Sequence, residues 1–445
     1  LTFLEYSRGI FYIGDIPTET MSPKSDEAGD VYQLENWIAN RETEQLQYYF
    51  KYCYIAINRA NTVIDHIQNS SVLSETARRR ILGEAYFLRA WNYFNLVRTF
   101  GIVPVQTKMV AELSQTTPPM ATGLDQLYDL ILGDLTRADN LLEVNKVFGR
   151  ADKVAAQSLM AKAYLTIASS KEHNVHRYTE MRREPRIMYD SAAYWAGKVV
   201  RDYKNVYDFD TNLRDIYDVD KPTGPEHIFI MPIDRSGTQE GNYSKLPLLF
   251  LPSNNSVPFY IRYGNGDLQR ANGNGWGVFL CNDEFVETQF STTDKRRTEL
   301  IHRDIYDASG NPIVPNQVKG YFSSKYVDPD FIGERTSARP YLIRFSDIAL
   351  VYAEAAGPEA GLAYVNRIRE RAGVTPLPSG MTTDKFREAV IKERALELAF
   401  EGNRLYDLRR TASVTTTDIK AAGLSEAEAA YYPIPQREID LNPNL

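Results

Sequence analysis

Residues 384–410 carry the densest set of ionisable side chains in this sequence. Glu393, Glu397 and Glu401 are spaced four residues apart, so on a helix their carboxylates form a row along one side. The helix is predicted by apolar residues at helical spacing, namely Phe386, Ala389, Val390, Leu396 and Phe400. Because carboxylates beside an apolar face are costly to bury alone, we expect buried ion pairs with the arginines of the segment, which are Arg394, Arg404, Arg409 and Arg410.

The same row of carboxylates has a catalytic interpretation. Two carboxyl groups one helical turn apart can share a proton or a metal ion. A glycoside hydrolase, however, needs two carboxyl groups about 5–10 Å apart that flank the scissile bond. Neighbouring arginines also lower carboxylate pKa values, which disfavours a general acid. The sequence therefore favours a structural role for the row.

Several motifs in this sequence resemble those of one known family. The run ERALELAFEGNRLYDLRR (393–410) closely resembles the C-terminal signature of the RagB/SusD family. In the family's order, similar segments are PYLIRFSDIALVYAEAA (340–356, with Arg344, Asp347 and Glu354), AYVNRIRERAGV (363–374) and YYPIPQREIDLNPNL (431–445). The N-terminal half adds NRANTVID (58–65), EAYFLRAWNYFNLVRTFGIVPV (84–105) and GRADKVAAQSLMAKAYL (149–165). The resemblance covers nearly the whole chain, and Arg344, Asp347 and Glu354 join the expected ion-pair network.

The resemblance implies a location and partners. Members of this family are glycan-binding lipoproteins on the outer membrane of Bacteroidetes-type bacteria, at the extracellular face. They pass their ligand to a SusC-like TonB-dependent transporter, and some members serve peptide import instead. The family's export signal and lipidated cysteine precede the folded part, so we expect the given chain to be trimmed at its N-terminus.

Composition excludes other classes of function. The 445 residues carry a formal net charge of −7, which disfavours a nucleic-acid partner because phosphate binding needs a basic surface. Cys53 and Cys281 are the only cysteines, too few for a thiol-rich zinc site. No phosphate-binding loop, nucleophile elbow or zinc-protease motif occurs, and no run of 18 apolar residues is present. We therefore expect no cofactor, no metal ion and no enzymatic activity.

Helical periodicity predicts a mainly α-helical fold. About eight helices are expected, at residues 43–69, 75–99, 125–142, 151–169, 190–203, 340–356, 359–372 and 384–402. Small residues recur along 155–168, which permits the close helix approach of stacked tetratricopeptide-like hairpins, here in degenerate form. We expect an N-terminal helical part (1–204), a loop-rich insertion (205–339) and a C-terminal helical part (340–445), together forming one structural unit.

The insertion is the expected ligand face. It is rich in Gly, Pro, Asn and Asp, with short strands predicted at His227–Pro232 and Lys319–Val327. Aromatic side chains can cover the apolar face of a sugar ring while planar polar side chains bind its hydroxyl groups. The candidate ligand residues are Phe259, Tyr260, Tyr263, Arg270, Asn272, Asn274 and Trp276. Alternatively, Trp276 fills a packing gap, and Trp37 and the 106–122 loop are other candidates for ligand contact.

Four functions remain open from the sequence. The preferred one is a non-enzymatic protein that captures oligosaccharides or polysaccharides and delivers them to a SusC-like transporter. The second is a peptide-binding member of the same family, because tyrosine-rich polar loops also suit extended peptides. A helical glycoside hydrolase and a tetratricopeptide scaffold are the third and fourth.

Overall fold

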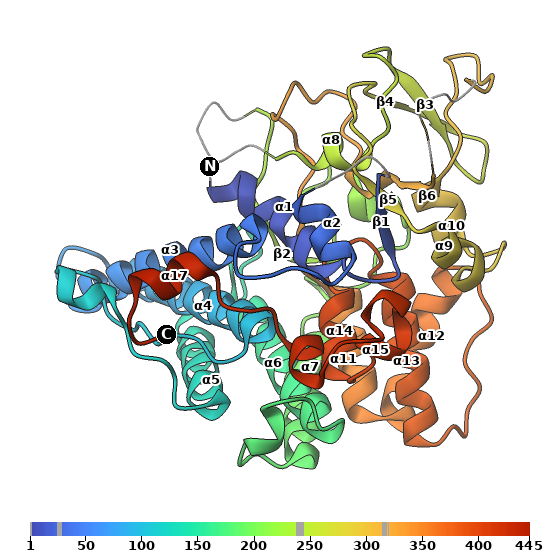
Figure 1. Cartoon of the computed structure of the whole chain (residues 1–445). Coiled ribbons are helices and arrows are strands. Elements are labelled where there is room, and N and C mark those ends of the chain that lie inside the picture. Colours follow the sequence, from blue (N-terminus) through green and yellow to red (C-terminus); the bar gives the residue numbers. More distant parts are fainter. Residues whose placement is uncertain (1, 25–28, 237–243, 314–317, 319) are drawn as a thin grey trace. The chain divides into compact units, whose positions relative to one another are not determined.

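The computed structural model of the chain describes residues 2–24, 29–236, 244–313, 318 and 320–445 (Figure 1). Two compact units are present, and each is assembled from two stretches of the chain. The first unit contains Leu1–Trp37 and Asp208–Leu405, and the second contains Ile38–Tyr207 and Tyr406–Leu445. Residues 208–339 of the expected insertion therefore lie in the first unit.

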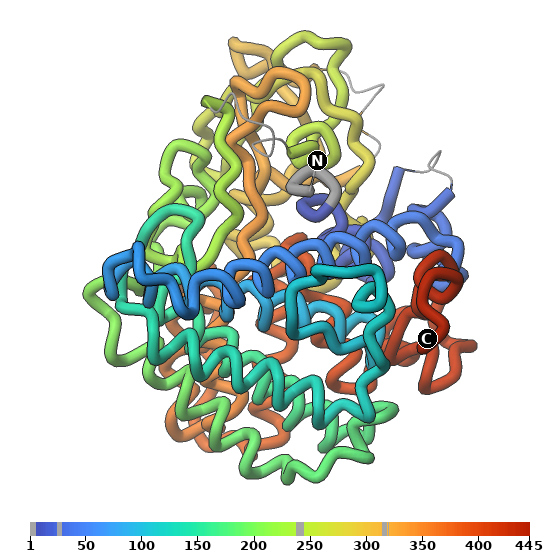
Figure 2. Tube along the Cα trace, turned by 90° about the vertical axis from the view of Figure 1, so that its left-hand side faces the viewer, coloured from blue at the N-terminus to red at the C-terminus, as the bar shows by residue number. Residues whose placement is uncertain are grey.

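The second unit is built from long helices stacked as antiparallel hairpins. Its main helices are α3 (Glu44–Ile67), α4 (Glu75–Phe100), α5 (Leu124–Leu141), α6 (Lys153–Glu172) and α7 (Pro185–Asp202). Each packs on the next along the chain, and Figure 2 follows them running back and forth from blue to green. The small residues of α6, including Ala155, Ala156 and Ala163, are fully buried and permit this close packing. Short helices α15 (Val414–Thr417), α16 (Glu426–Ala430) and α17 (Gln436–Leu441) complete the unit.

The first unit combines helices with two-stranded antiparallel sheets. Its helices are α1 (Thr2–Gly14), α2 (Asp30–Glu35), α8 (Leu246–Phe250), α9 (Asp283–Gln289), α10 (Lys295–Leu300), α11 (Phe345–Ala356), α12 (Pro358–Arg371) and α13 (Thr383–Glu397). The strand pairs are β1 (Met21–Pro23) with β5 (Phe279–Cys281), β2 (His227–Ile230) with β8 (Tyr341–Arg344), β3 (Phe259–Arg262) with β4 (Leu268–Ala271), and β6 (Ile301–His302) with β7 (Phe322–Ser323). Helix α14 (Arg404–Arg410) contains the boundary between the two units.

The predicted fold class is confirmed. The chain is mainly helical with tetratricopeptide-like hairpins, and each of the eight expected helices has a counterpart. Two expected elements begin differently: α7 starts at Pro185 instead of residue 190, and residues 341–344 form strand β8 before α11. Only Phe322–Ser323 of the strand expected at 319–327 is extended, and Lys319 lies outside the described residues.

The helix expected at 384–402 ends at Glu397, so the prediction was wrong for its last turn. Phe400 has φ +64° and Gly402 has φ +74°, which no right-handed helix allows. Side chains from elsewhere in the unit donate hydrogen bonds to the backbone carbonyl oxygens of residues 397–400. Arg344 donates to the Glu397 oxygen (2.6 Å), Lys325 to the Ala399 oxygen (2.8 Å) and Tyr326 to the Phe400 oxygen (2.8 Å). Tertiary hydrogen bonds therefore replace the last helical turn.

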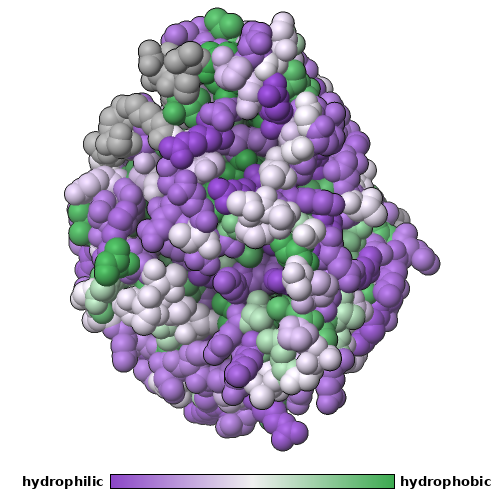
Figure 3. Space-filling model, turned by 90° about the vertical axis from the view of Figure 1, so that its right-hand side faces the viewer, coloured by the Kyte–Doolittle hydropathy of each residue, from purple (hydrophilic) through white to green (hydrophobic). Residues whose placement is uncertain are grey.

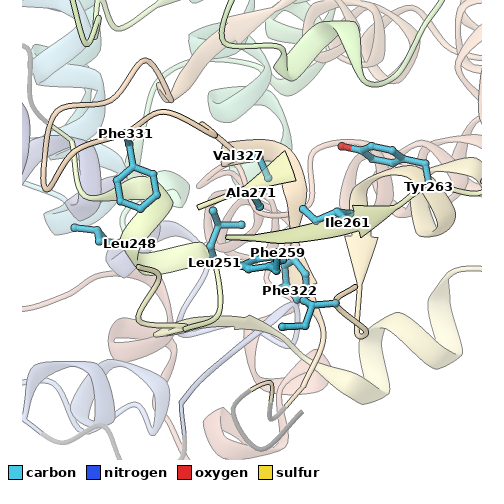
Figure 4. Packing of buried hydrophobic residues seen from close by; sticks show 10 residues of the cluster. Leu248, Leu251, Phe259, Ile261, Tyr263, Ala271, Phe322, Val327 and Phe331 are labelled. Atoms are coloured by element: carbon cyan, nitrogen blue, oxygen red, sulfur yellow. The ribbon is translucent and has the colours of Figure 1, made fainter. Parts of the chain in front are cut away.

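An apolar cluster lies under the β3–β4 hairpin (Figure 4). Side chains alternate between the two faces of a strand, so Phe259 and Ile261 point into this cluster and are fully buried. They pack with Leu248, Leu251, Ala271, Ile305, Phe322, Val327 and Phe331. The hairpin is thereby anchored on one face, and its other face carries Tyr260 and Arg270.

Candidate ligand-binding site

Trp276 stands on a loop that the backbone holds tightly. The Trp276 N–H donates to the Leu248 oxygen (2.6 Å), and a Cβ atom added at Gly275 would lie 2.0 Å from the Leu251 oxygen. At Gly273 an added Cβ would lie 2.0 Å from the Val257 oxygen. Only glycine permits these approaches, which explains the glycine spacing around the tryptophan. Trp276 is 48% exposed, so it does not fill a packing gap.

A lysine accompanies the Trp276 ring. The Lys245 Nζ atom lies 5.8 Å from the ring centroid, within the range of a cation–π contact. Its ammonium group also pairs with the Glu334 carboxylate at 3.0 Å. Lys245 was not predicted as a site residue, because it is distant from Trp276 along the chain and no local pattern connects the two. The site thus offers an aromatic face beside an ion pair.

The other predicted ligand residues divide into two groups. Arg270 is exposed and pairs with Asp330 (3.0 Å), while Asn272 donates to the Phe331 oxygen (3.0 Å) and accepts from Asn274. These polar residues lie on the strand and turn that lead to Trp276, and Tyr260 is half-buried opposite Arg270. Phe259 does not belong to the site. It was predicted as a ligand contact, but it is fully buried in the apolar cluster because its position on β3 faces inward.

A pocket of about 590 Å³ lies along β4, on the side of this strand that faces away from β3. Of the predicted residues, only Tyr263 and Arg270 line it. Arg214 sits between the Asp267 carboxylate (3.2 Å) and the Glu299 carboxylate (3.5 Å), with its guanidinium 4.5 Å from the Tyr263 ring centroid. Burial raises the pKa of the Tyr263 hydroxyl to about 12, so this group stays protonated, and it donates its hydrogen bond to the Gln269 Oε1 atom. The pocket is polar, and a cation already covers the ring of each tyrosine that lines it, Arg214 at Tyr263 and Lys325 at Tyr217 (4.8 Å).

The glutamate row lies in a buried ion-pair network. Arg344 is 1% exposed and contacts Glu226, Glu397 and Glu401 at 2.8 Å each. Around this centre the network contains the cations Arg296, Arg369, Arg371 and Lys325 and the carboxylates Asp294 and Glu393. Five carboxylates therefore meet five cations, which balances the buried charge.

Electrostatics in the network keeps Glu226 and Glu397 ionised. Burial by itself raises the pKa of the Glu397 carboxyl, but Arg371, Arg344 and Arg296 outweigh burial and hold the pKa at about 2. The pKa of Glu226 is lowered in the same way, with burial opposed by Arg371 and Arg344. These carboxylates are fully buried and ionised, so they are unsuited to act as general acids.

Four of the predicted network residues lie outside the network around Arg344. Arg404 pairs instead with Glu19, and Arg409 donates to backbone oxygens of Ala429, Arg98 and Thr99. Arg409 lies in the second unit, so its closeness to the glutamate row along the sequence did not determine its partners. Asp347 pairs with Arg394 (2.8 Å) on the far side of α13, and Glu354 is buried two turns further along α11.

Asp15 is a buried carboxyl group at the end of α1. It accepts a hydrogen bond from the Gly402 N–H at 2.6 Å, while its Oδ1 atom has no hydrogen-bond partner among the residues that the structure describes. Burial raises the pKa of Asp15 to about 7, against the lowering effect of the Gly402 and Arg404 N–H groups. This carboxyl group therefore titrates near neutral pH.

The remaining expectations concern the cysteines and the N-terminal aromatic residue. Cys53 and Cys281 are free, buried thiols, and burial raises both pKa values. Trp37 is only 9% exposed, which removes it as an alternative ligand contact. In the 106–122 loop the large exposed apolar side chain is Leu113, at 85%. Among the helices described here, none is sufficiently long and apolar to cross a membrane.

Comparison with known families identifies the class of protein. A SusD family model matches residues 304–445, and a model described as starch-binding, associating with the outer membrane, matches residues 13–165. Together the two stretches make up more than half of the chain. The chain belongs to the SusD family, as its motifs predicted.

Individual relatives agree with this assignment. SusD-like protein P2 of Formosa agariphila is 24% identical over 409 residues, which is 85% of this chain and 74% of that protein. Among solved structures, a laminarin-binding SusD-like protein matches with a TM-score of 0.77 and 22% identity, over 98% of this chain and 92% of that one. A crystal structure with xylogluco-oligosaccharide matches with a TM-score of 0.75 and 19% identity, over 100% and 96%. At these identities the structural matches show the shared fold.

Proposed function

We propose that this protein is a non-enzymatic surface glycan-binding protein. It captures oligosaccharides or polysaccharides and delivers them to a SusC-like TonB-dependent transporter of the outer membrane. Membership of the SusD family supports this role, as does the likeness to a laminarin-binding protein of the same fold. In this proposal a lipid anchor upstream of Leu1 holds the protein at the extracellular face. The outer-membrane association in the name of the second matching family model is consistent with that location.

The observation that carries the glycan-binding role is the exposed Trp276 ring. A large aromatic ring that stands on a tightly held loop and is about half exposed loses little conformational entropy when a sugar packs on its open part. Asn274 and the Lys245–Glu334 pair provide hydrogen-bonding groups on the same part of the first unit. Stacking plus planar polar groups is the chemistry that a sugar ring requires.

The binding role without catalysis rests on the burial of the glutamate row. Glu393, Glu397 and Glu401 have side chains at most 2% exposed, so a glycosidic bond does not reach them. Their ion pairs account for all three carboxylates without a substrate. The glycoside hydrolase considered from the sequence therefore loses its main candidate residues.

Titration calorimetry tests the proposal directly. The purified protein is titrated with a panel of β-glucan, xyloglucan and α-glucan oligosaccharides, together with peptides. We expect roughly micromolar to millimolar affinity for one glycan class, without release of shorter sugars, and loss of binding in Trp276→Ala. A variant with Trp276→Phe should retain part of the affinity, because phenylalanine still offers a ring face.

The chain offers a matched control. Trp195 is a partly buried tryptophan of the second unit with the Lys198 Nζ atom 5.0 Å from its ring. Trp195→Ala should leave glycan affinity unchanged. Binding that survives Trp276→Ala places the site elsewhere, and cleavage of any glycan contradicts the non-enzymatic role. Peptide binding without glycan binding favours the peptide-import alternative.

A further inference from the structure

The pocket beside Tyr263 contains an unpaired strand edge. Residues Leu268, Gln269 and Arg270 of β4 line the pocket, together with Arg214, Tyr217 and Val327. In the described part of the chain, β4 pairs with β3 alone, so its second edge faces the pocket. The hairpin that presents this edge is drawn at the top of Figure 1.

The register identifies which backbone groups point outward. Tyr260 lies opposite Arg270, but the Tyr260 N–H and C=O both pair with Tyr306, at 2.8 and 2.9 Å. Tyr260 and Arg270 are therefore a non-hydrogen-bonded pair, and the Arg270 N–H and C=O point away from β3. The same alternation applies two residues earlier, to Leu268 opposite Arg262. The Tyr263 N–H to Asp267 oxygen bond (3.0 Å) that closes the hairpin fits this register.

These outward groups have no partner within the described residues, although they line a recess in the protein surface. An exposed strand edge is a template for another strand, and proteins usually cover or interrupt such edges. Here two N–H and two C=O groups, at Leu268 and Arg270, are spaced as an added antiparallel strand requires. The edge is roughly 13 Å long at about 3.3 Å per residue, enough for a four-residue segment.

The charges of the pocket indicate what kind of segment fits. Its walls carry the carboxylates of Asp215, Asp218, Asp267 and Glu299 against the guanidinium groups of Arg214 and Arg270. Arg214 already pairs with both Asp267 and Glu299, and Arg270 pairs with Asp330. Lys221 pairs with both Asp215 and Asp218, so the four wall carboxylates share two cations. The excess of carboxylates favours a basic ligand over an acidic one.

We propose that this pocket binds an extended, basic peptide segment as an added strand on the free edge of β4. Main-chain hydrogen bonds at Leu268 and Arg270 supply the affinity, and lysine or arginine side chains of the peptide meet the surrounding carboxylates. Trp276 does not line the pocket, so this site is separate from the proposed glycan surface. The inference does not depend on the glycan-binding role.

The test uses a blocked hexapeptide of alternating lysine and threonine as the probe, followed by titration calorimetry and amide hydrogen exchange. We expect binding in the range of roughly 1 mM or tighter, with slowed exchange at the Leu268 and Arg270 amides. The same peptide with alternate backbone amides N-methylated should bind at least tenfold more weakly, because it cannot pair as a strand. A glutamate–threonine hexapeptide should also bind more weakly at low salt.

A matched pair of protein variants tests the same strand edge by changing the protein instead of the peptide. Arg270→Ala removes the side chain and keeps the backbone N–H, whereas Arg270→Pro removes both. Proline is tolerated at an outward-facing position of an edge strand. We expect Arg270→Pro to bind the peptide at least tenfold more weakly than Arg270→Ala. If the proline variant fails to fold, the N-methylated peptide decides the question.

Three results would overturn the proposal. The first is the absence of binding by the lysine–threonine peptide, and the second is equal affinity for the N-methylated peptide. The third is an oligosaccharide that displaces the peptide and protects the same two amides. That outcome would make the pocket part of the glycan site.

Discussion

The buried ion-pair network and the Trp276 loop lie in the same unit, and they differ in the solvent exposure of their side chains. In the network, Arg344 satisfies three carboxylates and is itself almost inaccessible to water. On the loop, glycines hold the backbone against Leu251 so that a large aromatic ring remains exposed. A cluster of buried ionisable side chains that are all paired indicates a structural role. An aromatic ring that stays outside the core indicates a binding role.

This contrast corrects a common inference from sequence. The residue types of the glutamate row suggest catalysis. Its carboxylates, however, are all engaged in ion pairs with the buried cations of the network. The tryptophan loop has no acid or base of note, yet it is available to a ligand. Availability, set by burial and pairing, separates the two regions more clearly than residue type.

The largest effect on stability is expected from Glu397→Gln. Neutralising this carboxylate leaves Arg344 and Arg371 with uncompensated buried charge, so the free energy of unfolding should fall by about 3–5 kcal/mol. Denaturant unfolding measures the change, and the exposed Glu388→Gln on the same helix is the control. Ligand affinity of the folded protein should be unchanged. Lost binding at unaltered stability would make the network functional and remove the contrast.

The next effect concerns Asp15 and pH. The folded-state pKa of Asp15 is raised from 3.8 to about 7, so its contribution to stability is complete below pH 3.8 and is lost as the pH rises through 7. The loss amounts to at most about 4 kcal/mol, at 1.36 kcal/mol per pKa unit. Asp15→Asn should therefore exceed the wild type in unfolding free energy at pH 8 and lose that advantage toward pH 4. Unfolding curves for both proteins across this range check the sign, and parallel curves would contradict it.

A smaller loss is expected from Gly275→Ala. The added Cβ would meet the Leu251 oxygen, so the loop must shift, at a cost of about 1–3 kcal/mol. Glycan affinity should fall as well, although position 275 itself offers no side chain to the ligand. Gly423→Ala is the control, because an added Cβ there meets nothing within 4 Å. An unchanged affinity would show that the position of Trp276 is not critical.

The smallest effect on stability is expected from Trp276→Ala. A half-exposed side chain outside the core should change the unfolding free energy by no more than about 0.5 kcal/mol. Its glycan affinity should nevertheless fall at least tenfold, which corresponds to about 1.4 kcal/mol. Thermal unfolding and titration calorimetry of one preparation measure both quantities. A large loss of stability would mean that the ring packs within the protein after all.

Figure 3 shows the hydropathy of one face of the molecule. The face in Figure 3 is mainly hydrophilic with scattered apolar residues, so no broad apolar patch marks a ligand there. The glycan candidate depends on one ring and the peptide candidate on a strand edge. Both are recognised from local geometry.

Much of this protein follows from the sequence alone. Helical periodicity, small residues at close spacing and the C-terminal motifs predicted the fold class, the positions of eight helices and the family. These features are local, because apolar spacing along the chain decides which face of a helix is buried.

Tertiary structure alone decided which residues meet. Arg296 and Lys325 come from distant segments to pair with the glutamate row, and Glu226 joins the same network by pairing with Arg344. No spacing in the sequence connects these three residues to the row. Phe259 and Tyr260 are neighbours of similar type, yet strand alternation buries the first in the core. Partners and exposure are properties of the packed chain, because burial and charge pairing depend on distances that sequence separation does not set.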